Sequence, residues 1–413
     1  MHSLWGSERI CVIQVARISY YLSKLSFVTF CLPISMSIFF SIFSLGRGGK
    51  DCFAMSRHPR PDVEIFQAAS SDYTELMSIS EGIYRGVDPL PFKYHEWLAD
   101  PQRKMFLAKF EEQVVGFMSF LLVDNGTTAV AEGLRVAPWI RGCGIAKALQ
   151  KFCLDNLRSY HPKTTRIRFT GSNETPPTIR RCQQVHSKSV ISVQIPYDQM
   201  EEKIKLLEQR LESVGERRPV VALGPSEVLH LFKEPSLPTE GLLPNGLLIQ
   251  SWVPLSTHRS NLELLLRRGV AWFYSQPLDS RSECAIQFST SDSLYTHQEP
   301  SEPYPVPLLH SSSLPSPSTL SCGFLSLGTP PFPVPLGDGI HRFDIDLFGT
   351  DPISAQTHVL HQLIEMQRVL PSGANVVCYL FAEKILSPEL TQFFQGLEPF
   401  YEVTEQQVFE REV

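Results

Sequence analysis

The chain has 413 residues, and its 37 Lys and Arg against 43 Asp and Glu give a formal net charge of −6. This length predicts about two or three domains with a proper hydrophobic core, which excludes disorder as the main state. The acidic balance offers no basic field to a nucleic-acid backbone, so nucleic acid is excluded as a leading partner. Nine scattered cysteines without a Cys-x-x-Cys pair argue against a disulfide framework and a structural zinc site, and favour a reducing compartment.

Residues 1–54 differ in sequence character from the part of the chain that is expected to fold. Leu25 to Leu45 carry no charge and lie between Lys24 and Arg47, which is typical of a membrane anchor. Interruption by Pro33, many serines and a second methionine at Met55 favour an upstream extension that the fold does not need. We therefore expect a cytoplasmic protein, with membrane contact only if residues 25–45 are a real anchor.

Helices and strands alternate in a first domain at residues 61–197. Apolar spacing predicts helices at Ser71–Ile83, Phe92–Ala99 and Gly144–Tyr160, and strands at Met105–Phe110, Val114–Val123, Thr127–Val136 and Arg166–Phe169. Asp124-Asn125-Gly126 between two apolar runs is a hairpin signal, so the first three of these strands should form an antiparallel meander. The helix after it has an apolar face that should pack on the sheet.

A helix at Asp198–Val214 suggests a boundary, and a second domain is expected at residues 215–413. Strands are predicted at Leu247–Val253, Val270–Tyr274, Phe343–Phe348, Asn375–Phe381 and Gln406–Arg411, with helices at Asn261–Arg268, Pro352–Leu370 and Pro388–Leu397. Between them, residues 289–321 are dominated by Ser and Pro, which predicts a disordered insert or, alternatively, a Pro-rich ligand for a recognition domain. Two α+β domains in tandem are the economical interpretation.

One motif carries chemistry. Residues 132–146 (EGLRVAPWIRGCGIA) lead from a strand through a short loop into a helix and match Arg-x-x-Gly-x-Ala at 141, 144 and 146. A glycine-rich turn at a helix N-terminus exposes backbone N–H groups that favour a pyrophosphate. A dinucleotide fingerprint fails because Lys147 stands where it needs a third glycine, and a Walker-type loop fails on spacing.

The segment LRVAPWIRGCGIAKALQKFC resembles motif A of the GNAT superfamily of acetyl-CoA-dependent N-acetyltransferases. Residues 79–101, EGLRVAPW and RFDIDLFGTD (342–351) together resemble the histidine N-acetyltransferase family and its close relatives. The resemblance covers most of residues 61–413 and implies a GNAT fold, a mostly antiparallel mixed sheet flanked by helices, followed by a degenerate GNAT-like domain. No second Arg-x-x-Gly-x-Gly/Ala occurs, so one cofactor site and no metal are expected.

The resemblance also implies which residues hold acetyl-CoA. The backbone of Leu134 and Val136 would line the pantetheine and the thioester. The backbone amides that would hold the pyrophosphate are those of Arg141, Gly142, Cys143, Gly144, Ile145 and Ala146.

Glu132 is the predicted general base. Period-two alternation places it on the same strand face as Val130, Leu134 and Val136. A carboxylate among apolar neighbours should have a raised pKa, which suits a base near neutral pH. The alternative interpretation is that Glu132 only pairs with a nearby arginine.

The amine acceptor should bind among the aromatic-rich helices before the sheet. Tyr84, Asp88, Tyr94 and His95 are the predicted contacts, with Trp97 a further candidate. The aromatic residues would stack on a flat ring and Asp88 would attract a cationic amine. Alternatively, Tyr94 and Trp97 are core residues and His95 is a satisfied surface histidine.

The expected tyrosine acid is missing between Thr170 and Ser189, where Cys182 and Gln183 stand instead. Residues 172–188 are predicted to be loop-like and irregular. Either the thiolate leaves without such help, or Tyr160 or Tyr197 reaches the site. Taken together, the sequence predicts direct acetyl transfer to a primary amine, and the resemblance points to the α-amine of L-histidine. The alternatives are a protein N-terminal or lysine acetyltransferase and a silent acyl-CoA-binding module.

Overall fold

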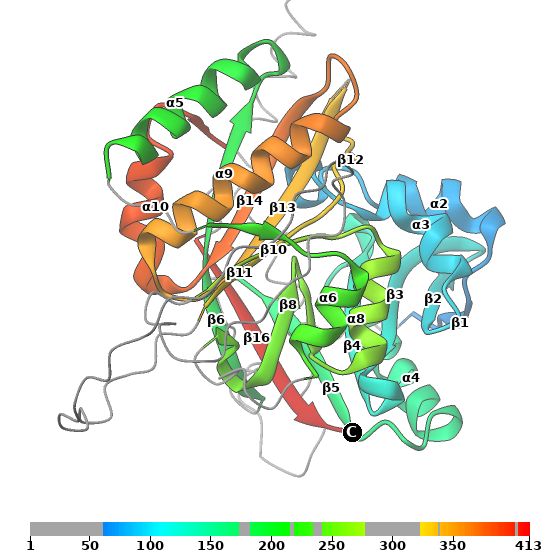
Figure 1. Cartoon of the computed structure of the whole chain (residues 1–413). Helices are drawn as coiled ribbons and strands as arrows, with labels where there is room; N and C mark the ends of the chain where they lie inside the picture. The colour runs from blue at the N-terminus through cyan, green and yellow to red at the C-terminus, as the bar shows by residue number, and fades with distance from the viewer. Residues whose placement is uncertain are drawn as a thin grey trace, which may run out of the picture.

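One mixed sheet runs through both halves of the chain (Figure 1). The computed structural model describes residues 61–172, 182–214, 219–233, 242–276, 323–337, 339–400 and 404–413. Within these residues, fourteen strands form the sheet in the order β1-β2-β3-β4-β5-β16-β6-β14-β13-β11-β10-β7, with β12 beside β13 and β15 beside β6. The predicted α+β class is confirmed.

The bounds of the elements are as follows. The strands of the sheet are β1 (Glu64–Gln67), β2 (Arg103–Phe110), β3 (Gln113–Val123), β4 (Thr128–Val136), β5 (Arg166–Gly171), β6 (Gln183–Ile195), β7 (Val221–Ala222), β10 (Ala271–Ser275), β11 (Phe324–Gly328), β12 (Phe332–Pro333), β13 (Ile340–Phe348), β14 (Asn375–Ala382), β15 (Glu398–Pro399) and β16 (Glu405–Glu412). A separate hairpin consists of β8 (Leu247–Gln250) and β9 (Val253–Ser256). The helices are α2 (Tyr73–Ser78), α3 (Leu90–Ala99), α4 (Ile145–Tyr160), α5 (Met200–Glu212), α6 (Pro225–Leu231), α8 (Arg259–Arg267), α9 (Pro352–Val369) and α10 (Ser387–Phe393).

The first half contains the predicted antiparallel meander, β2 to β4, and the strand β1, which the sequence pattern did not predict, pairs antiparallel with β2. The chain then crosses through α4 to β5, which pairs parallel to β4. Ile145, Leu149 and Leu157 are buried on the face of α4 that packs on β2 and β3, because they recur at helical spacing. This packing confirms the amphipathic helix that the sequence predicts.

The last strand of the chain completes the sheet of the first half. β16 lies between β5 and β6 and pairs antiparallel with both. Phe409 of β16 stacks on Phe169 of β5 with ring centroids 5.3 Å apart, and both side chains are buried in the first core. The two halves are therefore joined by backbone hydrogen bonds.

The second half contains the same kind of crossover. β13 leads through α9 to β14, and the two strands are parallel neighbours. Helices α5, α9 and α10 pack together over this part of the sheet (Figure 1). Because α5 is buried in the second core, the helix that suggested a boundary belongs structurally with the second half.

The prediction of an irregular stretch at residues 172–188 is wrong for its second part. Residues 173–181 lie outside the described residues, but Gln183–Ile195 form the long strand β6. β6 lies between β16 and β14, so distant strands supply the hydrogen bonds that stabilise it. Its own residues do not alternate regularly between polar and apolar, which is why local periodicity does not reveal it.

Two predicted segments cannot be compared with the structure. Residues 1–54 and 289–321 lie outside the described residues. Among the helices that are described, none combines the length and the apolar character needed to cross a membrane.

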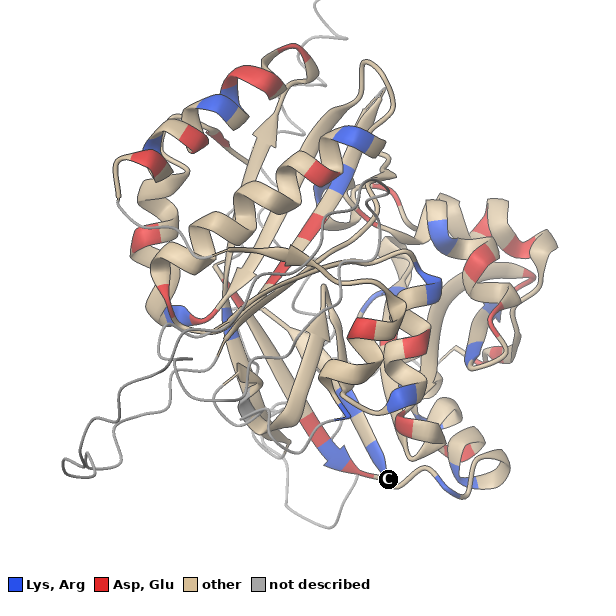
Figure 2. Cartoon of the chain, in the orientation of Figure 1, with Lys and Arg blue, Asp and Glu red and all other residues tan. Residues whose placement is uncertain are grey.

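Charged residues of both signs are distributed over the exposed helices (Figure 2). Lys151 and Asp155 of α4 are 2.5 Å apart, and Arg259 and Glu263 of α8 are 2.8 Å apart. Exposed pairs one helical turn apart contribute only about 0.3–0.5 kcal/mol each. The stability of the fold therefore depends mainly on the buried sheet and its helices.

Replacing Phe409 with alanine should destabilise the whole chain, because the missing ring would leave an empty space where β16 joins the first core. We expect the free energy of unfolding to fall by about 3–5 kcal/mol. Urea unfolding of the full chain measures this loss, with the exposed neighbour Glu412→Ala as the control. A loss no larger than that of the control would contradict the structural importance of β16.

Candidate active site

The loop before α4 has the geometry of an anion site. Gly142 and Gly144 have φ angles of +84° and +90°, which side chains rarely adopt, and a Cβ added at Gly142 would meet no atom within 4 Å. The first intrahelical hydrogen bond of α4 runs from the N–H of Ala148 to the carbonyl of Gly144. The amides of Ile145, Ala146 and Lys147 precede it, so they point out of the helix end toward open space.

Strands β4 and β5 separate beside this loop. Thr128–Val130 of β4 pair with Arg166–Arg168 of β5, and beyond this point, among the described strands, β5 pairs with β16 alone. Within the described residues, no strand pairs with β4 on that side at Leu134 and Val136, as an extended ligand would require. The side chain of Arg141 braces the loop, since its Nε donates to the carbonyl of Val136 (3.1 Å).

A bulge in β4 changes which side chains face the site. The register with β3 shifts between Phe117 and Ser119, opposite Gly133, which has a φ of +70°. Because a bulge breaks the two-residue period, Glu132 lines a cavity while the side chains of Leu134 and Val136 pack in the first core. The predicted common face for these residues is wrong for this reason.

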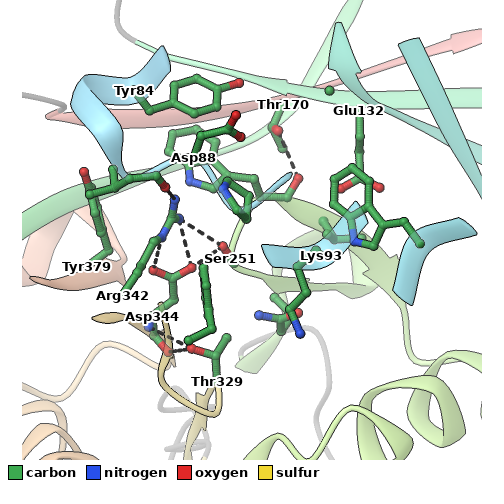
Figure 3. A pocket seen from close by; sticks show the side chains of 18 of the residues that line it. Tyr84, Asp88, Lys93, Glu132, Thr170, Ser251, Thr329, Arg342, Asp344 and Tyr379 are labelled. Atoms are coloured by element: carbon green, nitrogen blue, oxygen red, sulfur yellow. Dashed lines mark hydrogen bonds and ion pairs between the residues drawn. The ribbon is translucent and has the colours of Figure 1, made fainter. Parts of the chain in front are cut away.

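That cavity lies between the two halves of the chain and has a volume of about 200 Å³ (Figure 3). The first half contributes Tyr84, Asp88 and Glu132, and the second half contributes Ser251, Arg342 and Tyr379. Helix α3, strands β4 and β5, the β8–β9 turn, β13 and β14 all supply walls. The second half thus closes the cavity over the first.

Glu132 is held by an arginine. Its Oε2 lies 2.7 Å from Nη2 of Arg103, and the two side chains are 13% and 1% exposed. The Arg103 guanidinium lies 3.9 Å from the centre of the Trp97 ring and donates to the hydroxyl of Ser119 (3.2 Å). The expected apolar surroundings of Glu132 are therefore wrong, and the arginine pair that was the alternative interpretation is present.

Asp88 is engaged with the protein itself. It forms a buried ion pair of 2.7 Å with Arg135, and it accepts a hydrogen bond from the N–H of Leu90 (3.1 Å) at the start of α3. Arg135 also donates to the hydroxyl of Ser80 (2.9 Å). Asp88 lines the cavity as predicted, but its charge is already neutralised.

Tyr84 faces the cavity from a strained backbone position (Figure 3). Its φ is +51° and that of Arg85 is +55°, in a turn that ends just before Asp88. Burial, followed by the negative charge of Asp88, raises the pKa of Tyr84 to about 12. The phenol therefore stays protonated at neutral pH and can donate a hydrogen bond to a ligand.

Tyr94 and His95 do not line the cavity, which corrects two predicted contacts. Tyr94 is fully buried and donates to the carbonyl of Ala69 (2.6 Å), whereas His95 stacks on Tyr73 with ring centroids 5.2 Å apart. On α3 the cavity face consists of Lys93, Glu96 and Trp97, which recur at intervals of three and four residues. Trp97 is thus the aromatic residue of this helix that faces a ligand.

The second half contributes site residues that the sequence prediction missed. Arg342 donates to Asp344 from Nε (2.8 Å) and Nη2 (2.9 Å), and its guanidinium lies 4.6 Å from the centre of the Tyr379 ring. Ser251 donates from its hydroxyl to Asp344 (2.5 Å) (Figure 3). Charges at every second position of an otherwise apolar strand, RFDID, were the available signal.

Neither alternative tyrosine reaches the cavity. Tyr160 is 74% exposed at the end of α4, and Tyr197 is 43% exposed with its hydroxyl 3.3 Å from that of Ser372. Cys182 is buried in the first core, and residues 173–181 lie outside the described residues. Among the described residues, the tyrosines that line the cavity are Tyr84 and Tyr379.

In the crossover of the second half, by contrast with that of the first, the N-terminal end of the helix α9 is closed. β13 and β14 stay paired from Ile340 to Asp346, and the carboxylate of Asp351 accepts from the N–H of Ser354 (2.8 Å) at the start of α9. A side chain therefore occupies the helix end that is open in α4.

Comparisons with known proteins find two family models and several similar proteins. The acetyltransferase (GNAT) family model matches residues 64–180, and the model of the histidine N-acetyltransferase C-terminal region matches residues 216–300 and 316–383. Probable N-acetyltransferase 16 of Homo sapiens is 32% identical over 363 residues, covering 85% of this chain and 86% of that protein. Histidine N-acetyltransferase of Xenopus tropicalis is 31% identical over 321 residues, covering 78% and 85%. A solved tandem GNAT protein from the clavulanic acid biosynthesis pathway is 12% identical, with a TM-score of 0.47 over 85% of this chain and 98% of that one.

Proposed function

Because the chain belongs to the histidine N-acetyltransferase family of GNAT acetyltransferases, we propose that it transfers the acetyl group of acetyl-CoA to the α-amine of L-histidine. The product would be N-acetylhistidine, formed by direct transfer between the two substrates. The observation that carries the proposal is the position of Glu132. It lies where the opening between β4 and β5 meets a cavity that the second half closes.

The residues of the loop and of β4 suit acetyl-CoA. Arg141 to Ala146 would hold the pyrophosphate through backbone amides, and the unpaired edge of β4 at Leu134 and Val136 would hold the pantetheine. Space at Gly142 and the absence of a capping side chain at the start of α4 support this assignment. When bound, acetyl-CoA supplies an acyl thioester that is activated toward an amine.

Glu132 would accept the proton that the ammonium group of the acceptor must lose before it becomes a nucleophile. Its pair with Arg103 fixes the direction of a carboxylate that lines the cavity. Tyr84 is the neutral hydrogen-bond donor in the same cavity and is the candidate to help the thiolate leave.

The cavity suits a free amino acid better than a protein. It is closed by residues of both halves, and its volume of about 200 Å³ is that of a single small molecule. Trp97, Trp252 and Tyr84 offer aromatic surfaces to an imidazole ring. A protein N-terminus or a lysine side chain would require an open groove.

The full chain should release thiol from acetyl-CoA when L-histidine is the acceptor. The assay compares the free amino acids with a lysine peptide and an N-terminal peptide. Turnover with L-histidine and none with the peptides is the expected result. Turnover with peptides alone would establish a protein acetyltransferase, and acetyl-CoA binding without turnover would establish a binding module.

Gly142→Val should weaken coenzyme A binding by at least about tenfold, or ~1.4 kcal/mol, because a branched side chain would fill the anion site. Calorimetric titration with coenzyme A measures the change. Gly373→Val is the matched control. Gly373 has a φ of +81° and, like Gly142, open space around it, but it belongs to the turn after α9 and not to the loop before α4. Equal affinity in the two variants would refute the proposed cofactor site.

Glu132→Gln should lower kcat by about 10²- to 10⁴-fold, the usual contribution of a general base, and leave coenzyme A affinity nearly intact. The rate of the variant should rise steadily with pH, because solvent hydroxide then deprotonates the amine. Exposed Glu81→Gln is the control. A variant with wild-type activity at neutral pH would remove Glu132 from the mechanism.

A further inference from the structure

The cavity holds one basic side chain more than its own acids can neutralise at close range. Its basic residues are Lys93, Arg103, Arg135, Arg268 and Arg342. Four of them contact an acid of the cavity at 2.7–2.8 Å, in the pairs Lys93–Glu96, Arg103–Glu132, Arg135–Asp88 and Arg342–Asp344. Arg268 is the exception.

Arg268 has only a distant acidic partner. Its Nη2 lies 3.9 Å from Asp100, and its guanidinium donates no hydrogen bond to another residue in the part of the chain that the structure describes. The side chain is only 18% exposed. A guanidinium has five N–H donors, so a buried one without close acceptors has capacity for a ligand.

The backbone holds Arg268 in a fixed position at the end of α8. The N–H of Gly269 bonds to the carbonyl of Leu266 (3.0 Å), and the N–H of Val270 bonds to that of Leu265 (3.3 Å). This pair of bonds is the Schellman motif that ends many helices, with Gly269 at a φ of +69°. Arg268 therefore enters the cavity from a rigid turn.

The charges around Arg268 favour an anion beside it. Burial lowers the pKa of Arg268, and the positive charge of Arg103 lowers it further, while Glu132 and Asp100 act in the opposite direction. An anion bound beside Arg268 would offset the cost of burying its charge.

We infer that Arg268 binds the α-carboxylate of the amino-acid acceptor. The inference rests on the proposed function, since a free amino acid carries its carboxylate next to the reacting amine, whereas a protein N-terminus has an amide there. In such an acceptor the amine and the carboxylate share one carbon atom. A carboxylate held at Arg268 would therefore place the amine in the cavity that Glu132 also lines.

This assignment gives Arg268 a role in specificity. It predicts that free amino acids are preferred over their amides, and over amines that lack the carboxylate. The second half of the chain would then select the acceptor, while the first half binds acetyl-CoA.

The test compares kcat/KM for L-histidine and L-histidinamide in the wild type, Arg268→Met and Arg268→Lys. Arg267→Met, an exposed neighbour, is the matched control. In the wild type we expect L-histidine to be preferred by roughly 10- to 150-fold, the range for a hydrogen bond to a charged group. Arg268→Met should lose this preference by losing activity on L-histidine, with activity on the amide and KM for acetyl-CoA little changed. Arg268→Lys should recover part of it.

Several outcomes would overturn the inference. They are a wild type without preference for the free acid, a preference retained in Arg268→Met, or a raised KM for acetyl-CoA alone, which would assign Arg268 to the cofactor. Activity on the amide shows that a variant is folded. If Arg268→Met has no activity on the amide, the preference of Arg268→Lys for L-histidine over L-histidinamide is the measurement that tests the inference. If the wild type acetylates peptides only, the proposed function fails and the inference fails with it.

Discussion

The pairing of β16 with both β5 and β6 is the constraint on which the rest of the structure depends. It makes one sheet from two halves and so fixes the cavity between them. Arg168 of β5 reinforces it, because its side chain contacts Glu410 of β16 at 2.6 Å and Asp124 at 2.8 Å. Asp124 in turn accepts a hydrogen bond from Ser256 of the second half (2.7 Å). A strand at the end of the chain thus controls the geometry of a site whose cofactor loop lies far earlier.

The two crossovers show how one topology provides different sites. In the first, β4 and β5 separate after three paired residues on each strand, and the helix that follows begins at a glycine. In the second, the strands stay paired along most of β13, and the carboxylate of Asp351 occupies the helix end. The first helix end therefore leaves backbone amides open to an anion, and a side chain fills the second. The second half is free to serve as a wall of the acceptor cavity.

Local signals in the sequence predict the parts of the fold that local physics determines. Asn125-Gly126 marks the hairpin, the spacing from Ile145 to Leu157 marks α4, and the glycines mark the loop. The insertion of β16 and the strand β6 depend on partners far away in the chain, so periodicity does not reveal them. For the same reason the sequence prediction found Tyr84 and Asp88 in the cavity but not the contribution of β13. On α3 it named aromatic residues without the helical phase that turns Trp97 toward the cavity and Tyr94 into the first core.

The ion pairs in the cavity are better understood as a scaffold than as a source of stability. Removing two charges from water costs several kcal/mol per ion, and the attraction within a buried pair often does no more than offset that cost. What the pairs of Arg103, Arg135 and Arg342 provide is a set of acids held in fixed directions around one small volume. A zwitterionic acceptor brings one charge of each sign into this volume. Its carboxylate needs a basic side chain that no acid contacts closely, and among the described residues that line the cavity Arg268 meets that condition.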